Sequence, residues 1–202
     1  NAAAQQDAAT HLARLHGVTG RHFGLERDTL IGGLPQPNSE SSSWLKFFAE
    51  HRLLYMGRQA LDAGCLPAPT FKRIEALCGL LGRWIDEPSS PALIHGDIWS
   101  GNILCHHGRI TAFVDPAIYY ADPEIELAFS TLFDTFSDVF FDRYQEHRPL
   151  APGFFEERRD LYNLYPLLVH VHLFGRSYLS SVERILKKFE HRYHCLLYTS
   201  DA

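Results

Sequence analysis

Residues 95–115 place an aspartate, an asparagine and a second aspartate at spacings that suit phosphoryl transfer. Asp97 follows His95-Gly96, Asn102 comes five positions later, and Asp115 comes thirteen positions after Asn102. A loop can present Asp97 to a substrate hydroxyl as its proton acceptor. Asn102 and Asp115 offer a neutral and an anionic oxygen, which are ligands that suit Mg²⁺. The set predicts kinase-type chemistry with one base and two metal ligands.

A β-hairpin between Asn102 and Asp115 would bring these two residues together. Two short apolar runs, Ile103–Cys105 and Ile110–Val114, flank a turn at His107-Gly108 and predict that hairpin. The alternative is structural: Asp97 and Asn102 would only shape a turn, and Asp115 would cap a helix. We favour the catalytic interpretation because H-G-D-x4-N followed by a hairpin and Asp-Pro is far more specific than an isolated H-G-D.

Most of the remaining chain shows helical patterning. Apolar side chains follow Ser41–Ser43 at helical spacing from Trp44 to Tyr55 and predict a helix that the serines cap and that packs into the core. Arg52 lies on this helix; it could contact substrate, but on a mostly apolar helix it is expected to extend to the surface. Further helices are predicted over residues 1–16, 71–84, 154–171 and 178–189, and from residue 122 onward with Asp122 as N-cap and Pro123 at the first helical position.

Composition places the chain among ordinary globular domains. Its 202 residues are 46% hydrophobic and 21% charged, close to the average for soluble proteins. Nineteen basic and 24 acidic residues give a net charge of −5, so no basic excess is available to bind nucleic acid. No apolar run reaches the roughly 18 residues that span a bilayer, and the cysteines form no C-x-x-C pair. These features predict a cytoplasmic protein with reduced thiols and no nucleic-acid or membrane partner.

The segment His95-Gly96-Asp97-Ile98-Trp99-Ser100-Gly101-Asn102 resembles the catalytic motif of the fructosamine kinase (ketosamine-3-kinase) family, a relative of aminoglycoside phosphotransferases and choline kinases. Similar blocks run from about residue 8 to 189. They include Leu12-Ala13-x-Leu15-His16, Ile31-Gly32-x-x-Pro35-Gln36-Pro37-Asn38, Phe48-x-x-His51-Arg52-Leu53, Asp115-Pro116-Ala117-x-Tyr119-Tyr120 and Glu124-x-Glu126-Leu127-Ala128. The resemblance implies an α+β, mainly α fold. Residues 1–193 would form the C-terminal lobe of a protein-kinase-like enzyme, with a short β-hairpin after the catalytic loop.

The resemblance also implies a reaction. Asp97 would be the catalytic base, and Asn102 and Asp115 would hold Mg²⁺. ATP would donate its γ-phosphoryl group to the 3-hydroxyl of a ketosamine (fructosamine), either a small molecule or an adduct on a glycated protein. The phosphorylated adduct would then decompose and free the amine, so the implied role is deglycation repair.

Four further residues would complete the site by resemblance. Trp99 would offer a flat surface to the sugar, although a packed core aromatic would predict the same residue. His170 would line the same pocket; the family block there resembles Asn-His-x-Asn, whereas this chain has valine on both sides of the histidine. His95 and Glu126 would support the catalytic loop. Glu126 stands where an aspartate is typical, so it would either brace the loop with one extra methylene or leave the loop loosened.

The two ends of the chain carry separate expectations. The glycine-rich phosphate cover and the lysine of the family's N-terminal lobe are absent from the sequence, and Asn1 is no translation start. We therefore expect a fragment that lacks the N-terminal lobe and that is inactive, or nearly so, on its own. Residues 194–202 change character after a well-patterned helix and are predicted to be a non-native tail.

Other functions fit parts of the pattern. An antibiotic or choline kinase could use the same scaffold, but Trp99 and the Pro35-Gln36-Pro37-Asn38 block favour a ketosamine acceptor. A non-catalytic, pseudokinase-like module is disfavoured because Asp97, Asn102 and Asp115 are all intact. Histidine pairs such as His106-His107 do not predict a zinc site, because no further ligand recurs at a familiar spacing.

Overall fold

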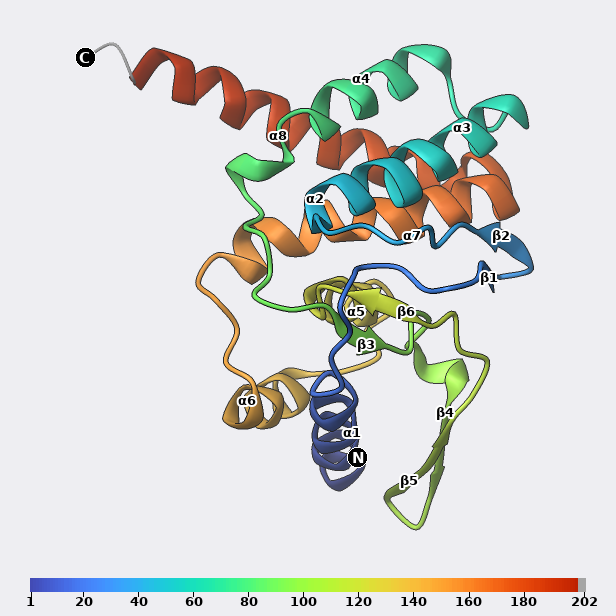
Figure 1. Cartoon of the computed structure of the whole chain (residues 1–202), viewed down its shortest axis with the longest axis vertical. Helices are drawn as coiled ribbons and strands as arrows, with labels where there is room; N and C mark the ends of the chain where they lie inside the picture. The colour runs from blue at the N-terminus through green and yellow to red at the C-terminus, as the bar shows by residue number, and fades with distance from the viewer. Residues whose placement is uncertain (200–202) are drawn as a thin grey trace.

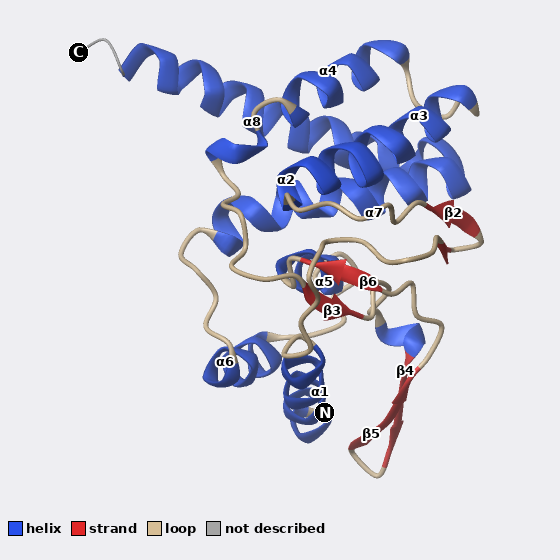
Figure 2. Cartoon of the chain, viewed as in Figure 1, coloured by secondary structure: helices blue, strands red, loops and turns tan. Residues whose placement is uncertain are grey.

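The fold is mainly helical with short strands, as expected (Figure 1, Figure 2). The computed structural model describes the backbone of residues 1–199 and the side chains of residues 1–192. The α-helices are α1 (Ala2–Leu15), α2 (Trp44–Phe47), α3 (Tyr55–Asp62), α4 (Ala68–Cys78), α5 (Glu124–Ser130), α6 (Asp138–His147), α7 (Arg159–Phe174) and α8 (Leu179–Thr199). Shorter π- or 3₁₀-helical turns are η1 (Phe48–Leu54), η2 (Leu81–Arg83), η3 (Ser100–Asn102), η4 (Phe154–Arg158) and η5 (Gly175–Tyr178). The predicted tail, residues 194–202, lies outside the residues whose side chains are described.

Helix α7 lies at the centre of the helical part of the molecule. Every residue from 161 to 169 is buried, which is typical of a helix covered on all sides. It packs against α3, α5 and α8, and Figure 1 shows it running behind α2 and α3. Among the described residues, no helix combines the length and the apolar character needed to cross a membrane.

The helix predicted after the serine run is confirmed. Ser43 Oγ accepts a hydrogen bond from the Lys46 amide at 3.2 Å and so caps α2. Helices α2, η1 and α3 follow one another without a break. Trp44, Phe47 and Phe48 are fully buried, so the apolar stripe packs into the core, as predicted.

The predicted helix boundaries differ from the structure at several places, and two of the helices show why. The helix expected over residues 71–84 is α4, which begins earlier because Pro69 is compatible with a first helical turn. It ends at Cys78, directly before Gly79, and residues 81–83 form the separate turn η2. Helix α5 begins one residue later than expected, at Glu124, and Asp122 Oδ1 accepts the hydrogen bond of the Glu124 amide at 2.9 Å.

The expectation that Arg52 reaches the surface is wrong, because the side chain is fully buried. Its guanidinium group donates to the Pro37 carbonyl and to Asn38 Oδ1, each at 2.7 Å. It also lies 3.8 Å from the centre of the Tyr119 ring. Neutral oxygens and a ring face thus take the place of a carboxylate partner.

The strands form antiparallel pairs that position the loops between them. They are β1 (Thr29–Ile31) with β2 (Leu34–Gln36), β3 (Ala92–Ile94) with β6 (Tyr119–Ala121), and β4 (Ile103–His106) with β5 (Arg109–Phe113). The β4–β5 hairpin is the predicted one and extends away from the helices in Figure 1. The β3–β6 pair places Ile94 opposite Tyr119. This pairing brings the loop after β3 close to the start of α5, which follows β6.

Candidate active site

The loop after β3 turns sharply at Gly96, directly before Asp97. Gly96 has a φ of +86°, and a Cβ at this position would lie 2.2 Å from the carbonyl oxygen of Ala117. Only glycine fits so close an approach. The Ala117 amide donates to the His95 carbonyl at 2.8 Å. The loop is therefore clamped to the segment that follows Asp115.

Asp97 and Asn102 are in direct contact. Asn102 Nδ2 donates to the Asp97 main-chain carbonyl and to Asp97 Oδ2, each at 2.9 Å. These bonds use both amide hydrogens, so Asn102 Oδ1 remains as a potential cation ligand. Burial raises the pKa of Asp97, and the hydrogen bond from Asn102 opposes that rise. A raised pKa makes this carboxylate a stronger proton acceptor, as a general base requires.

Asp115 returns to this pair at the end of the β4–β5 hairpin. The Val114 amide donates to the Asn102 carbonyl at 3.0 Å, which places the next residue, Asp115, near Asn102. The charge of Asp115 contributes to the raised pKa of Asp97. Asp115 is exposed and has a φ of +52°, a left-handed conformation that is costly for a residue with a side chain and that recurs at functional sites. The structure brings the three predicted residues together; their roles stay predictions.

His95 links the two sides of this neighbourhood. Its Nε2 lies 2.9 Å from the Val114 carbonyl oxygen, which can only accept, so the ring proton is assigned to Nε2. Nδ1 is then free to accept the Asp97 amide at 3.3 Å. The imidazole therefore connects the residue before Asp115 to Asp97; its role as a loop support stays a prediction.

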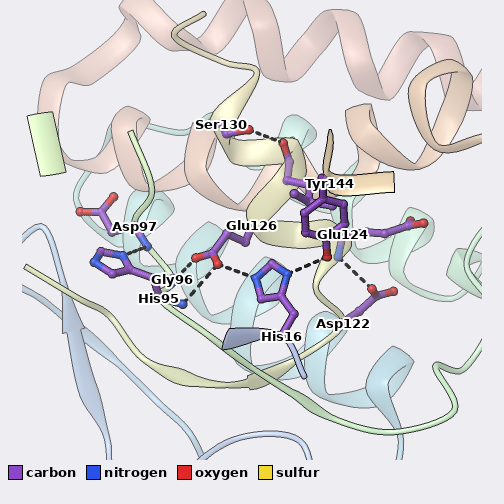
Figure 3. Close-up of polar contacts among 10 residues, drawn as sticks. His16, His95, Gly96, Asp97, Asp122, Glu124, Glu126, Ser130 and Tyr144 are labelled. Carbon is purple, nitrogen blue, oxygen red and sulfur yellow. Dashed lines mark hydrogen bonds and ion pairs between the residues drawn. The ribbon is translucent and has the colours of Figure 1, made fainter. Parts of the chain in front are cut away.

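Glu126 bonds directly to the loop from His95 to Asn102, which we call the catalytic loop after its predicted role (Figure 3). It does so although its side chain is one methylene longer than the aspartate that is typical here. Oε1 accepts the Gly96 amide at 2.6 Å, and Oε2 accepts the His95 amide at 3.3 Å. Burial alone would raise the pKa of Glu126, but the hydrogen bond from His16 opposes that rise, and the pKa lies below its usual value. The carboxylate is thus kept ionised as an acceptor. The expectation of a loosened loop is wrong, because the extra methylene still allows contact with both amides.

A hydrogen-bonded chain behind Glu126 was not predicted. His16 Nε2 lies 2.7 Å from Glu126 Oε2, and His16 Nδ1 lies 2.7 Å from the Tyr144 hydroxyl (Figure 3). An ionised carboxylate only accepts, so Nε2 carries the proton. Burial raises the pKa of Tyr144, so its hydroxyl keeps its proton and can donate to Nδ1. The sole sequence signal for His16 is its place in the block Leu12-Ala13-x-Leu15-His16, and nothing in the sequence singles out Tyr144.

Replacing His16 with Phe is expected to loosen the catalytic loop selectively. The change removes the proton donor of Glu126 but keeps a flat ring in the site. We expect faster exchange of the Gly96 amide hydrogen in this chain, measured by NMR. We also expect kcat to be roughly 10–10²-fold lower, with little change in KM, in an enzyme that joins this chain to an N-terminal lobe of a relative. Small errors in positioning cost that much.

Two further variants separate positioning by His16 from general stability. His16→Gln retains an amide that can donate to Glu126 and should restore much of the Gly96 protection. Tyr144→Phe removes the far end of the chain but leaves the donor on His16, so it should lower stability without a selective effect at Gly96. Equal acceleration of exchange throughout the chain in His16→Phe would contradict this role.

Asp97 opens into a cavity of about 430 Å³ between the catalytic loop, α5 and α7. Trp99 and His170, both predicted to bind substrate, line this same cavity, as does Glu126. The indole of Trp99 lies against Gly101, where a Cβ would come within 2.3 Å of the ring. Trp99 is 40% exposed, so it is a surface of the cavity and not a packed core aromatic.

Arg52 supports the wall of this cavity, a role that the helical pattern could not show. The guanidinium lies over Tyr119 and 5.5 Å from the centre of the Tyr165 ring, and both tyrosines line the cavity. The Tyr165 hydroxyl donates to Gln36 Oε1 at 2.6 Å. The Pro-Gln-Pro-Asn block thus contacts the site through Arg52 and Tyr165.

The oxygen donors at the site fit a hard cation. Across the described residues, no three His, Cys, Asp or Glu side chains gather in an arrangement that could hold a metal. Asn102 and Asp115 offer a different set, an amide oxygen and a carboxylate. Mg²⁺ suits such a set because it keeps water and phosphate oxygens as its other ligands.

Comparison with known proteins identifies the relatives of this chain. The sequence model of the family described as fructosamine kinase matches residues 1–192. A protein of Synechocystis sp. named "Probable ketoamine kinase" is 41% identical over 180 residues, which cover 88% of this chain and 59% of that protein. Protein-ribulosamine 3-kinase, chloroplastic, of Arabidopsis thaliana is 35% identical over 187 residues, which cover 92% of this chain and 57% of that protein. The chain thus spans about three fifths of the length of these relatives.

Solved structures show the same likeness. The crystal structure of a proposed fructosamine-3-kinase from Thermobifida fusca superposes with a TM-score of 0.87 at 35% identity, over 93% of this chain and 65% of that chain. The crystal structure of an aminoglycoside phosphotransferase superposes with a TM-score of 0.54 at 19% identity, over 93% of this chain and 65% of that chain. The second likeness shows the fold alone, and it confirms the predicted kinase-like fold. With a family match over residues 1–192, the chain belongs to the fructosamine kinase family.

Proposed function

We propose that this chain carries the acceptor site and the catalytic base of an ATP-dependent ketoamine 3-kinase. One observation supports this most: Asp97, held by Asn102 and close to Asp115, opens into the cavity that Trp99 and His170 line. A proton acceptor, two candidate metal ligands and an acceptor pocket are the parts that phosphoryl transfer needs. The implied role is the repair of glycated amines. A cytoplasmic location stays a prediction.

In this proposal the ketoamine 3-hydroxyl lies against Asp97. The hydroxyl oxygen forms a bond to the γ-phosphorus of ATP, while the bond from that phosphorus to the β–γ bridging oxygen breaks and ADP leaves. Asp97 accepts the hydroxyl proton. Glu126 and His95 hold the loop that carries Asp97. When Mg²⁺ is bound, it neutralises phosphate charge, and Asn102 and Asp115 are the residues that would hold it.

A phosphorylation assay tests this function. We define the two-lobe enzyme as this chain joined after an N-terminal lobe of the family. With ATP and Mg²⁺ it should phosphorylate ketoamines, both small molecules and glycated peptides, but neither kanamycin nor choline. Phosphorylation of kanamycin or choline instead would indicate an antibiotic or choline kinase and would contradict the proposal. No phosphorylation of any of these acceptors would favour a non-catalytic role.

We also expect this chain alone to be nearly inactive. The residues that we assign to the reaction bind the acceptor and Mg²⁺, whereas phosphoryl transfer also needs the nucleotide held in line. The expected turnover is below roughly 1% of that of the two-lobe enzyme, since positioning alone is worth several orders of magnitude. Side-by-side turnover measurements check this, and comparable rates for the two proteins would contradict it.

A further inference from the structure

The cavity at Asp97 has two unlike sides. The catalytic loop contributes Gly96, Asp97 and Ser100 on one side. The other side holds a group of rings around His170, which we call the aromatic rim. The rim consists of Phe133, His170, Phe174 and Tyr178, and the centre of the His170 ring lies 5.1, 5.5 and 4.8 Å from the ring centres of Phe133, Phe174 and Tyr178.

Several large apolar side chains of the cavity wall are exposed to solvent. Phe174 is 63% exposed, and Phe133 and Leu173 are each 37% exposed. Together with Trp99 they make up four of the eight exposed large hydrophobic residues in the described part of the chain, and all four line this one cavity. Exposed apolar groups that gather in one concave place are typical of a binding site.

Few polar atoms on the rim side are available to a ligand. His170 Nδ1 lies 2.7 Å from the Pro166 carbonyl oxygen, and the nearby Tyr165 hydroxyl is bonded to Gln36. The other polar atoms of the rim side chains are His170 Nε2 and the Tyr178 hydroxyl, so most of the rim surface is ring faces. Asp97 is the carboxylate that the cavity offers to a ligand, because the side chain of Glu126 is buried and bonded to His16 and to the loop amides. No Lys or Arg of the described chain lines the cavity.

We propose that the aromatic rim binds the carbon chain or ring attached to the ketoamine nitrogen. This inference rests on the proposed function. A ketoamine carries a polyol on one side of its reacting carbon and a substituted amine on the other. Hydroxyls placed on the rim would lose their hydrogen bonds to water, whereas an apolar substituent gains from burial. A protonated amine between the ring faces and the Asp97 carboxylate is also favoured.

The same charges predict a selectivity. A ketoamine formed on the α-amine of an amino acid has a carboxylate beside the nitrogen. That carboxylate would meet Asp97, and no Lys or Arg among the described residues lines the cavity to balance the two charges. The enzyme should therefore select ketoamines whose nitrogen substituent is apolar and has no carboxylate beside the nitrogen.

A substrate series tests both parts in the two-lobe enzyme. Ketoamines of one sugar with methylamine, propylamine and pentylamine differ only in apolar chain length. We expect kcat/KM to rise about 3–4-fold per added methylene until the rim is covered, as burial of one CH₂ predicts. Norleucine has the carbon chain of pentylamine plus a carboxylate, so its ketoamine should show a kcat/KM at least about tenfold lower than that of the pentylamine ketoamine.

Variants connect the effect to the rim. Phe174→Ala truncates an exposed ring at the end of α7 and should flatten the dependence on chain length, with a larger loss for pentyl than for methyl. Phe155→Ala is the control, because Phe155 is another exposed phenylalanine, at 37%, and does not line the cavity. It should leave the chain-length dependence as it is in the unmodified enzyme.

The outcomes separate this inference from the proposed function. If ketoamines are phosphorylated with a kcat/KM that does not depend on the nitrogen substituent, the rim does not bind it and the inference fails, while the function stands. Equal flattening in Phe174→Ala and Phe155→Ala would also overturn it. If no ketoamine is phosphorylated at all, the proposed function itself fails.

Discussion

Asp97→Asn in the two-lobe enzyme is expected to lower kcat about 10²–10⁴-fold, which is the usual contribution of a general base. The asparagine can still accept the hydrogen bond that Asn102 gives to Asp97 Oδ2. Loop geometry should therefore persist while proton acceptance is lost. KM for the ketoamine should change little, because the wall of the cavity is intact. Steady-state kinetics with a ketoamine and ATP measure both parameters.

A stability measurement accompanies this variant. Because burial raises the pKa of Asp97, the folded protein binds a proton there more readily than the unfolded chain does. Stability from that group is thus lost as pH rises through its pKa, and the ionised form opposes folding at pH 7. Asp97→Asn removes that charge, so its Tm at pH 7 should equal or exceed that of the unmodified protein. Turnover that survives the change would exclude Asp97 as the base.

Asp115→Asn is expected to weaken the use of Mg²⁺. The substitution keeps the shape of the side chain but removes the negative charge beside Asn102. Metal stabilisation of phosphoryl transfer is worth several kcal/mol, so kcat/KM at a fixed, limiting Mg²⁺ concentration should fall about 10²-fold. The Mg²⁺ concentration that gives half-maximal rate should rise at least about tenfold. Titration of activity with MgCl₂ measures this shift.

Asp134→Asn is a matched control for Asp115. Asp134 is also an exposed aspartate in a left-handed conformation, with a φ of +49° against +52° for Asp115. The charge of Asp115 is among the main influences on the pKa of Asp97, whereas that of Asp134 is not. The Mg²⁺ dependence should therefore stay unchanged in Asp134→Asn. A similar response in both variants, or in neither, would argue against Asp115 as a metal ligand.

The local parts of the site were predictable because their determinants are close together in sequence. The motif from His95 to Asn102 and the hairpin that ends at Asp115 lie within about twenty residues, so spacing and turn residues suffice. The start of α2 was predictable for the same reason, since its cap Ser43 lies directly before the apolar stripe.

The long-range parts could not be predicted from local pattern. His16 and Tyr144 are 128 positions apart in sequence but in contact, and Arg52 likewise lies over the ring of the distant residue Tyr119. Helix α6, which was not predicted, also depends on tertiary contacts, as in its packing against α1. The β1–β2 pair was missed for a different reason, since its Gly32-Gly33 turn is a local hairpin signal. Helical periodicity identifies a buried face but not the partner that will cover a polar residue on it.

The backbone at Asp115 has a further consequence for how this protein tolerates change. Glycine adopts its left-handed conformation without steric cost, so a chain selected only for resistance to heat would gain from glycine there. An enzyme that needs the carboxylate has to retain the less stable residue. At Asp115, therefore, durability and catalysis favour different amino acids, a trade-off that is common at functional sites.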